Sequence, residues 1–300
     1  MNAPATEDAE LLKAVSRTFY LSMRLLPQEM RRAVSLGYLL ARASDSVADT
    51  STAAPEQRLA VLQLMARAVA GEADADETES LLTRLGGVMA RAQQNPAEFR
   101  LLRFFGDYLT ALFALPQQER EPLQRVLSTI IEGQCWDLTA FRTADTVADD
   151  EETRCYTYRV AGCVGEFWTT LGYAVLGPRF ADPAKQDIMT RTAVRYGQGL
   201  QLVNILRDTE EDAARGRRYL CSDPQLWLSR AERYLNDGVD YSRRLRGYRL
   251  RLASVLPALL GLKTLRLLRR RKGTERVKIS RTCVYLTVLQ AALRCLLPSL

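Results

Sequence analysis

Apolar residues recur at the spacing of an α-helix along nearly all of this chain of 300 residues. They repeat every three or four residues through the segments 11–19, 34–42 and 101–113, and no segment shows the strict apolar–polar alternation of a half-buried strand. Prolines fall where such helices would begin or end. No linker is long or polar enough to divide the sequence. We therefore predict an all-α fold in a single domain over residues 1–300, with a flexible end at 1–8 and a terminal apolar helix at 282–300.

The chain contains no histidine, which removes several kinds of active site at once. Ser-His-Asp and Cys-His nucleophiles, histidine-ligated metals and imidazole bases are all excluded. Six cysteines are present, but none forms a C-x-x-C pair, so structural zinc and a redox dithiol are not expected. A long chain whose cysteines do not suggest a disulfide framework is typical of the reducing cytoplasm.

The net charge of +7 comes from one stretch of the sequence. Residues 243–281 hold 14 basic residues and one acidic residue, a net +13, whereas the remainder carries −6. In this stretch arginines alternate with leucines, and aromatic residues are almost absent. This composition favours an anionic membrane surface over nucleic acid as the binding partner. A solvated helix face is the simpler alternative. We expect a cytoplasmic protein without a nucleic-acid partner, peripheral on the inner face of the membrane.

Three pairs of aspartates show the spacing D-x-x-x-D, which places two carboxylates on one face of a helix. Such carboxylates repel each other, but a bound Mg²⁺ makes their proximity favourable, because it binds hard oxygen ligands and bridges them to phosphates. One pair, Asp145/Asp149, lies in an acidic, polar segment typical of solvent. The other two, Asp45/Asp49 and Asp208/Asp212, each end an apolar helix beside an arginine. These two favour a magnesium–phosphate site, and the alternative is helix-end solvation with local ion pairs.

Four sequence blocks together resemble the squalene/phytoene synthase family. They are SRTFY (16–20), RASDSVAD (42–49), YTYRVAGCVGE (156–166) and QLVNILRDTEED (201–212). They occur in the family's order and extend over most of the chain. A fifth block, VKISR (277–281), is similar to a lysine-bearing segment associated with reductive squalene synthases.

The resemblance implies an isoprenoid-synthase helical bundle in which the two aspartate motifs face each other across a central apolar cavity. It also implies Mg²⁺-dependent, head-to-head condensation of two prenyl diphosphates by a prenyltransferase. We expect the protein to be a monomer, although no sequence feature fixes its oligomeric state. The segment around Lys278 favours conversion of two farnesyl diphosphates to squalene, through presqualene diphosphate and with NADPH. Phytoene, dehydrosqualene and hydroxysqualene synthesis stay open as alternatives.

The resemblance also assigns roles to individual residues. The magnesium ligands would be Asp45, Asp49, Asn204, Asp208 and Asp212. The diphosphate would contact Ser16, Arg17, Thr18, Tyr38, Arg42, Gln201, Asn204, Arg207 and Arg218. Tyr156 would act with the four aspartates in catalysis, its ring facing the carbocation, and Lys278 would bind NADPH.

Two other functions compete with this interpretation. A class I terpene cyclase uses the same aspartate–magnesium chemistry, but it would not be expected to carry SRTFY and YTYRVAG. A non-catalytic family member acting as an assembly or scaffold protein would be expected to have degraded aspartate motifs, and here both are intact. The small residues Ala161, Gly162 and Gly165 predict either close approach to prenyl chains or close packing of helices. Thr157, Arg159 and Cys221 depart from the family's usual pattern, which leaves the product open.

Overall fold

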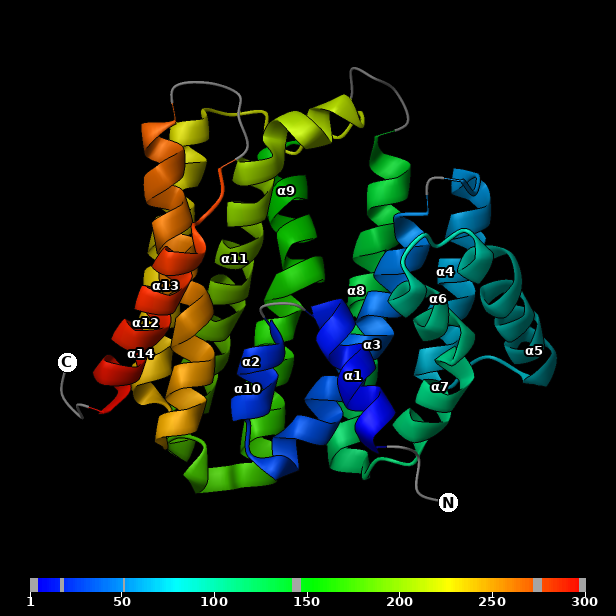
Figure 1. Cartoon of the computed structure of the whole chain (residues 1–300), viewed down its shortest axis with the longest axis horizontal. Helices are drawn as coiled ribbons and strands as arrows, with labels where there is room; N and C mark the ends of the chain where they lie inside the picture. Colours follow the sequence, from blue (N-terminus) through cyan, green and yellow to red (C-terminus); the bar gives the residue numbers. More distant parts are fainter. Residues whose placement is uncertain (1–4, 17–18, 51, 142–146, 272–276, 297–300) are drawn as a thin grey trace. The chain divides into compact units, whose positions relative to one another are not determined.

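The computed structural model describes residues 5–16, 19–50, 52–141, 147–271 and 277–296. Within these ranges the chain forms fourteen α-helices and no strand, which confirms the predicted all-α fold (Figure 1). The chain separates into two compact units. Unit 1 consists of Met1–Arg24 and Gln28–Leu138, and unit 2 consists of Leu25–Pro27 and Thr139–Leu300. The single domain and the central apolar cavity stay predictions.

Unit 1 is built around one long central helix, α3. Its buried residues Leu36, Leu39, Leu40, Ala43 and Val47 recur every three or four positions and form the core-facing side. Neighbouring helices of the unit pack on α3, notably α1, α4, α6 and α7. The helices of this part of the chain are α1 (Ala5–Ser16), α2 (Phe19–Leu25), α3 (Gln28–Ala48), α4 (Pro55–Ala70), α5 (Ala75–Arg84), α6 (Pro96–Arg103), α7 (Phe105–Phe113) and α8 (Gln117–Ala140), with a π-helical turn η1 (Leu85–Met89).

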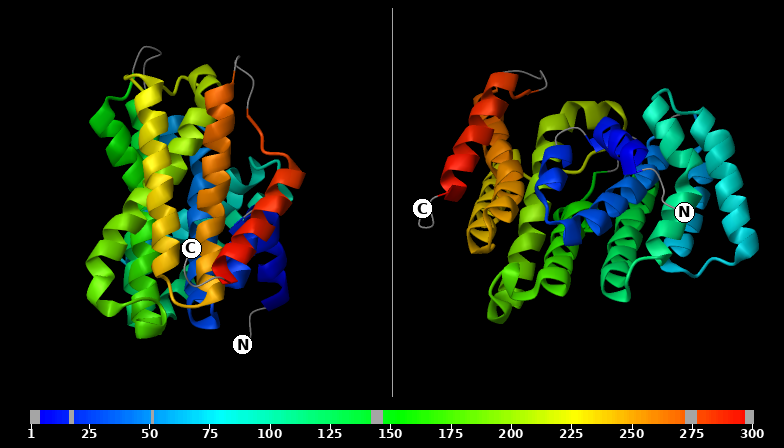
Figure 2. Two further views of the ribbon diagram at one scale, coloured as in Figure 1. Left: turned by 90° about the vertical axis from the view of Figure 1, so that its left-hand side faces the viewer. Right: turned by 60° about the horizontal axis from the view of Figure 1, so that its bottom comes forward.

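Unit 2 is built around α11, the longest helix described. It packs against α10, α12 and α13, and α12 and α13 run side by side (Figure 2). Trp227 and Leu235 of α12 are fully buried in the shared core. The elements are α9 (Asp150–Thr157), η2 (Tyr158–Gly162), α10 (Cys163–Leu176), η3 (Gly177–Arg179), η4 (Pro183–Lys185), α11 (Gln186–Ala214), α12 (Pro224–Arg244), α13 (Tyr248–Arg270) and α14 (Arg281–Leu296).

Side-chain caps fix where several of these helices begin. Asp74 before α5 and Asp149 before α9 each form a capping box with a glutamate three residues later. Asn95 caps α6 by accepting a hydrogen bond from the Ala97 amide. No helix within the described residues combines the length and the hydropathy that a membrane span needs.

Candidate active site

The first aspartate pair lies at the end of α3 in unit 1. The amide of Asp49 donates to the Asp45 carbonyl oxygen at 2.9 Å, so the two residues share the last helical turn and one face. The Asp45 side chain is 42% exposed. Partial burial, together with the charge of Asp49, raises the pKa of Asp45 to about 6, although Arg42 acts in the opposite direction. The pair therefore concentrates negative charge that a cation would relieve.

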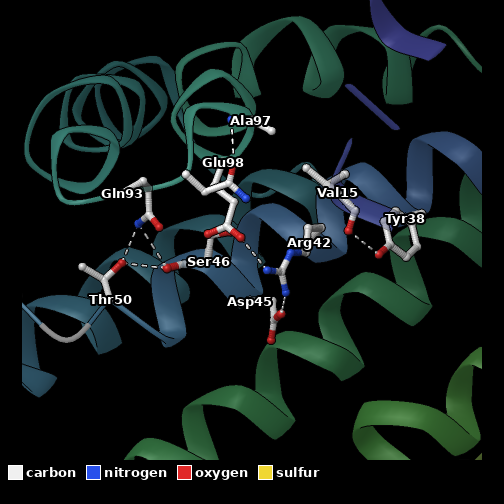
Figure 3. Close-up of polar contacts among 10 residues, drawn as sticks. Val15, Tyr38, Arg42, Asp45, Ser46, Thr50, Gln93, Ala97 and Glu98 are labelled. Carbon is white, nitrogen blue, oxygen red and sulfur yellow. Dashed lines mark hydrogen bonds and ion pairs between the residues drawn. The ribbon is translucent and has the colours of Figure 1, made fainter. Parts of the chain in front are cut away.

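Arg42 lies one turn before this pair and is held by two carboxylates. One guanidinium nitrogen, Nη1, forms an ion pair with Asp45, and the other, Nη2, lies 2.6 Å from Oε1 of Glu98 on α6 (Figure 3). Burial lowers the pKa of Arg42, but Asp45 and Glu98 together raise it above its ordinary value. Arg42 is thus a permanently charged group at the aspartate motif.

Two further predicted residues of unit 1, Tyr38 and Ser16, lie on α3 and at the end of α1. The Tyr38 hydroxyl on α3 donates to the Val15 carbonyl oxygen of α1 at 3.0 Å, as Figure 3 shows. Ser16 is buried, and its hydroxyl donates to the carbonyl oxygen of Leu12 within the same helix. Tyr38 therefore joins α3 to the end of α1, directly before the SRTFY block. The predicted diphosphate contacts Arg17 and Thr18 lie outside the described residues.

Two residues that the motifs do not include support this region. Glu98 follows the Asn95-Pro96 start of α6 and is the second partner of Arg42. The Gln93 amide nitrogen donates to Thr50 Oγ1 at 2.8 Å, and Thr50 Oγ1 donates to the Ser46 carbonyl oxygen at 2.6 Å. These contacts fix the chain on both sides of Asp49. Neither residue is close to α3 in the sequence, so motif spacing gave no signal for them.

The second aspartate pair lies near the end of α11 in unit 2. Both nitrogens on one side of the Arg207 guanidinium bind the Asp208 carboxylate, with Nε 2.8 Å from Oδ1. The Asp208 side chain is only 17% exposed, and that of Arg207 is 29% exposed. This hydrogen-bonded pair raises the pKa of Arg207. Asp212 is half-buried one turn further on. Each aspartate motif is thus accompanied by its own arginine.

Carboxamides extend the second motif towards the start of α11. Gln201, Asn204, Asp208 and Asp212 are three or four positions apart, so they share one face of the helix. The Asn204 amide nitrogen donates to Gln201 Oε1 at 3.3 Å, and Asn204 is exposed. The face presents oxygen atoms over three turns, which are the ligands that Mg²⁺ prefers.

Tyr156, the predicted catalytic tyrosine on α9, is buried in a tyrosine pair. Its ring stacks on Tyr219, with the centroids 4.9 Å apart and the planes at 12°. The hydroxyl of Thr153 donates to the Tyr219 carbonyl oxygen, and the Ala148 amide donates to the Arg218 carbonyl oxygen at 2.9 Å. The segment after α11 is therefore fastened to α9. The Arg218 side chain is exposed.

Lys278, the predicted NADPH ligand, precedes α14 and is exposed. Its assignment to NADPH stays a prediction.

The small residues of the YTYRVAGCVGE block pack helices closely together. A Cβ atom on Gly165 of α10 would lie 2.1 Å from the Ala193 carbonyl oxygen of α11. A Cβ atom on Gly197 of α11 would lie 2.2 Å from the Ala161 carbonyl oxygen of η2. The structure therefore confirms the packing interpretation of this block. The π-helical turn η2 begins directly after α9, which carries Tyr156, and such turns are frequent at functional sites.

The third aspartate pair has a structural role at Asp149. Its carboxylate accepts hydrogen bonds from the amides of Glu151 and Glu152, both at 2.8 Å, at the start of α9. This is the geometry of a helix N-cap. Asp145 lies outside the described residues. The contrast with Asp45 and Asp208, which bind arginines, separates the three pairs as the sequence context predicts.

The donor sets suit magnesium bound together with a phosphorylated substrate. In the described ranges no cluster of three or more histidine, cysteine, aspartate or glutamate side chains could hold a metal. Each motif offers a pair of carboxylates instead. Magnesium is commonly held by one or two carboxylates with substrate phosphates and water completing the shell. The residues present fit that mode of binding.

Comparison with known proteins decides the family. The sequence model of the family described as squalene/phytoene synthase matches residues 12–224. The chain belongs to the squalene/phytoene synthase family. Members of this family are prenyltransferases that join two prenyl diphosphates head to head and use a divalent metal. The matched residues include both aspartate motifs and Tyr156.

The individual relatives of this squalene/phytoene synthase family member are named for different products. It is 28% identical to a bifunctional lycopene cyclase/phytoene synthase of Pyrenophora tritici-repentis, over 75% of this chain and 35% of the relative. It is 32% identical to a presqualene diphosphate synthase of Rhodopseudomonas palustris, over 70% of this chain and 60% of the relative. The matched part therefore spans about a third of the Pyrenophora relative and about three fifths of the Rhodopseudomonas relative.

The fold agrees with that of solved relatives. A structure described as TcSQS in complex with the ligand E5700 superposes with a TM-score of 0.72 at 23% identity. The superposition covers 97% of this chain and 88% of the other. At this identity the likeness establishes the isoprenoid-synthase fold alone.

Proposed function

We propose that this chain is a prenyltransferase that condenses two prenyl diphosphates head to head with Mg²⁺. The observation that carries the proposal is the matched pair of motifs. Asp45/Asp49 and Asp208/Asp212 lie within the part of the chain that the family model matches, and each pair binds an arginine through one aspartate. A scaffold protein has no need of these like-charged pairs, which are unfavourable without a cation.

The roles of the residues follow from the chemistry of leaving groups. Magnesium, when bound, would supply positive charge that stabilises the departing pyrophosphate. Arg42 and Arg207 would donate from their planar guanidinium groups to diphosphate oxygens, in place of the carboxylates that they now bind. Asp45, Asp49, Asp208, Asp212 and Asn204 would hold the metal, and Ser16, Tyr38 and Gln201 would orient the diphosphate.

Tyr156 would act on the organic part of the substrate. Its stacked, buried ring offers a π-face to a carbocation, which rings stabilise at close range. Its hydroxyl would direct the movement of a proton or of pyrophosphate. The chain contains no histidine for this task.

We propose farnesyl diphosphate as the substrate and squalene as the product, formed through presqualene diphosphate with NADPH. This choice depends on the VKISR block with Lys278. Two observations favour a second candidate: Lys278 is exposed, and a relative at 32% identity is named presqualene diphosphate synthase. In that case the reaction would end at the cyclopropyl diphosphate.

One incubation separates these products. Purified protein is given farnesyl diphosphate and Mg²⁺, with and without NADPH, and both the organic and aqueous phases are analysed by mass spectrometry. Squalene only with NADPH is the expected result. A C30 diphosphate that remains the end product even with NADPH supports the second candidate, and an oxidised C30 hydrocarbon or alcohol without NADPH indicates dehydrosqualene or hydroxysqualene synthesis. A second incubation contains geranylgeranyl diphosphate instead. If only this substrate reacts and phytoene forms, the protein is a phytoene synthase, and no turnover of either substrate contradicts the proposal.

We further propose that the protein works as a monomer at the periphery of the inner face of the membrane. A C30 or C40 product is insoluble in water and has to be released into lipid. The cationic segment 243–281 supports this location because bilayers with anionic lipids attract such segments.

A further inference from the structure

Helix α14 exposes a row of large apolar side chains to solvent. The exposed fractions are 72% for Tyr285, 59% for Leu286, 57% for Leu289, 56% for Leu293 and 64% for Leu296. At about 100° per residue these positions fall within one face of the helix. We call these five residues the α14 apolar face. Figure 2 shows α14 leaning across α13 within unit 2.

The side of α14 that packs on the protein carries smaller side chains than the exposed side. Thr287 and Ala291, one turn apart, are fully buried, and Ala291 joins a cluster with Leu252, Leu256 and Leu259 of α13. In a soluble protein a helix normally turns its large apolar residues inward and its small or polar residues outward. Helix α14 has the reverse arrangement, and contiguous exposed apolar patches mark interaction sites.

The charged side chains of α14 and of its neighbour α13 are all positive. Neither α13 (Tyr248–Arg270) nor α14 (Arg281–Leu296) contains Asp or Glu. Exposed Arg281 lies one turn before Tyr285, and exposed Arg294 directly follows Leu293. An apolar face with arginines at both ends is the pattern of a helix that lies in a membrane interface.

We infer that the α14 apolar face is a docking surface for a bilayer containing anionic lipids. The leucines enter the acyl boundary, Tyr285 lies at headgroup depth, and Arg281 and Arg294 bind lipid phosphates. A second copy of the chain is a poorer occupant, because a two-fold contact would bring this acid-free, cationic surface against itself. Nucleic acid offers phosphates but nothing to cover four leucines. The inference names the surface behind the proposed location, and it holds whatever reaction the protein catalyses.

The test is flotation of the full chain with vesicles, which needs no substrate. The α14 variant carries Leu286→Gln, Leu289→Gln and Leu293→Gln. The matched control carries Val88→Gln, Ile188→Gln and Leu226→Gln, three residues that are similarly exposed but scattered over η1, α11 and α12. The vesicles are phosphatidylcholine alone or with about 30% phosphatidylglycerol. All proteins are compared by circular dichroism and thermal midpoint, and Leu289→Glu alone serves as a milder second variant.

The native chain and the scattered variant are expected to float with anionic vesicles. The α14 variant is expected to bind at least about tenfold more weakly, with Leu289→Glu intermediate. Binding should weaken on neutral vesicles and at high salt, because the arginine contribution is screened. Equal flotation of the native chain and both α14 variants overturns the inference. It is also overturned if the native chain fails to float, or if it is a dimer without lipid that the α14 substitutions convert to a monomer. Condensation activity measured in detergent reports separately on the proposed function.

Discussion

At the first aspartate motif, two carboxylates repel each other in the free protein, and a bound cation would remove this repulsion. Asp45 and Asp49 repel each other, and the pKa of Asp45 is raised to about 6 by burial and by Asp49. A carboxyl with a raised pKa binds its proton more tightly in the folded state than in the unfolded state. Its contribution to the free energy of unfolding therefore decreases as the pH rises from about 4 towards 6.

We predict that Asp49→Asn stabilises the metal-free protein but weakens its stabilisation by Mg²⁺ with pyrophosphate. Removal of one of two like charges should raise the free energy of unfolding by about 0.2–0.5 kcal/mol above pH 7, and the gain should disappear below pH 5. Urea unfolding with a chelator across this range measures the effect. The thermal shift produced by Mg²⁺ with pyrophosphate should become smaller. A loss of stability at neutral pH would contradict this account of the motif.

Glu98 keeps Arg42 in place at the motif. Its carboxylate holds Nη2 at 2.6 Å, so that Nη1 is directed at Asp45. We predict that Glu98→Ala raises the KM for the prenyl diphosphate about tenfold with a smaller change in kcat, because a charge-assisted hydrogen bond that orients Arg42 is lost. Glu98→Gln should restore part of the effect.

The control for Glu98 is another ion pair of similar length that joins two helices. Arg195 Nε on α11 lies 2.6 Å from the Asp237 carboxylate on α12. Asp237→Asn should lower the thermal midpoint without raising the KM. Equal KM values for Glu98→Ala and Asp237→Asn would show that Glu98 only stabilises the fold.

The candidate site shows how far single positions can be predicted from sequence. The aspartates and their arginines are neighbours on one helix, so spacing alone brings Arg42 to Asp45 and Arg207 to Asp208. Glu98 lies 56 residues from Arg42 and belongs to no motif. Its role arises from the packing of α6 on α3, which no local pattern encodes.

Among the helices, close backbone contact with α11 sets the position of the second motif. Gly165 and Gly197 allow α10 and η2 to touch α11 without intervening side chains. We predict that Gly165→Ala destabilises the protein by more than about 1 kcal/mol, because the new methyl would overlap the Ala193 carbonyl oxygen, which is backbone and cannot turn aside.

A helical glycine in open space provides the comparison. No atom lies within 4 Å of a Cβ added to Gly86 in η1, so Gly86→Ala should be neutral or slightly stabilising. Thermal and urea unfolding of the two variants measure the difference. Similar midpoints for both would show that α10 can move away from α11 easily.

The helices were predictable in kind but less so in their boundaries. Apolar periodicity predicts an all-α chain because 3.6-residue spacing is unmistakable over long segments. The acidic stretch 71–80 reads as a surface loop by composition, but α5 begins within it at Ala75. The reason is local: Asp74 and Glu77 form a capping box, and this D-x-x-E pattern starts a helix despite the polar composition.

At the scale of the whole molecule, the residues proposed for the reaction are divided between two compact units. Unit 1 contains Asp45 and Asp49, and unit 2 contains Asp208, Asp212 and Tyr156. The sequence shows both motifs because each is a local pattern on one helix. The cavity that the family resemblance implies depends on long-range packing of many apolar side chains, which spacing along the chain does not encode.

The reaction should need both aspartate motifs, because neither motif can replace the other. We predict that Asp45→Asn and Asp208→Asn each lower kcat/KM by at least about a hundredfold at saturating Mg²⁺, because each removes charge that positions the departing pyrophosphate. The double variant should be scarcely worse than either single one, as is found for groups that act as a unit.

The third D-x-x-x-D pair of the same chain provides the control. Asp149→Asn should leave kcat/KM unchanged, because Asn caps a helix about as well as Asp and the Asp149 carboxylate caps α9 by accepting the amides of Glu151 and Glu152. Steady-state kinetics of all four variants with farnesyl diphosphate, or with the substrate found by mass spectrometry, make the comparison. A loss at Asp149 as large as at Asp45 would mean that helix stability limits turnover. Additive losses at Asp45 and Asp208 would mean that the two motifs serve independent steps.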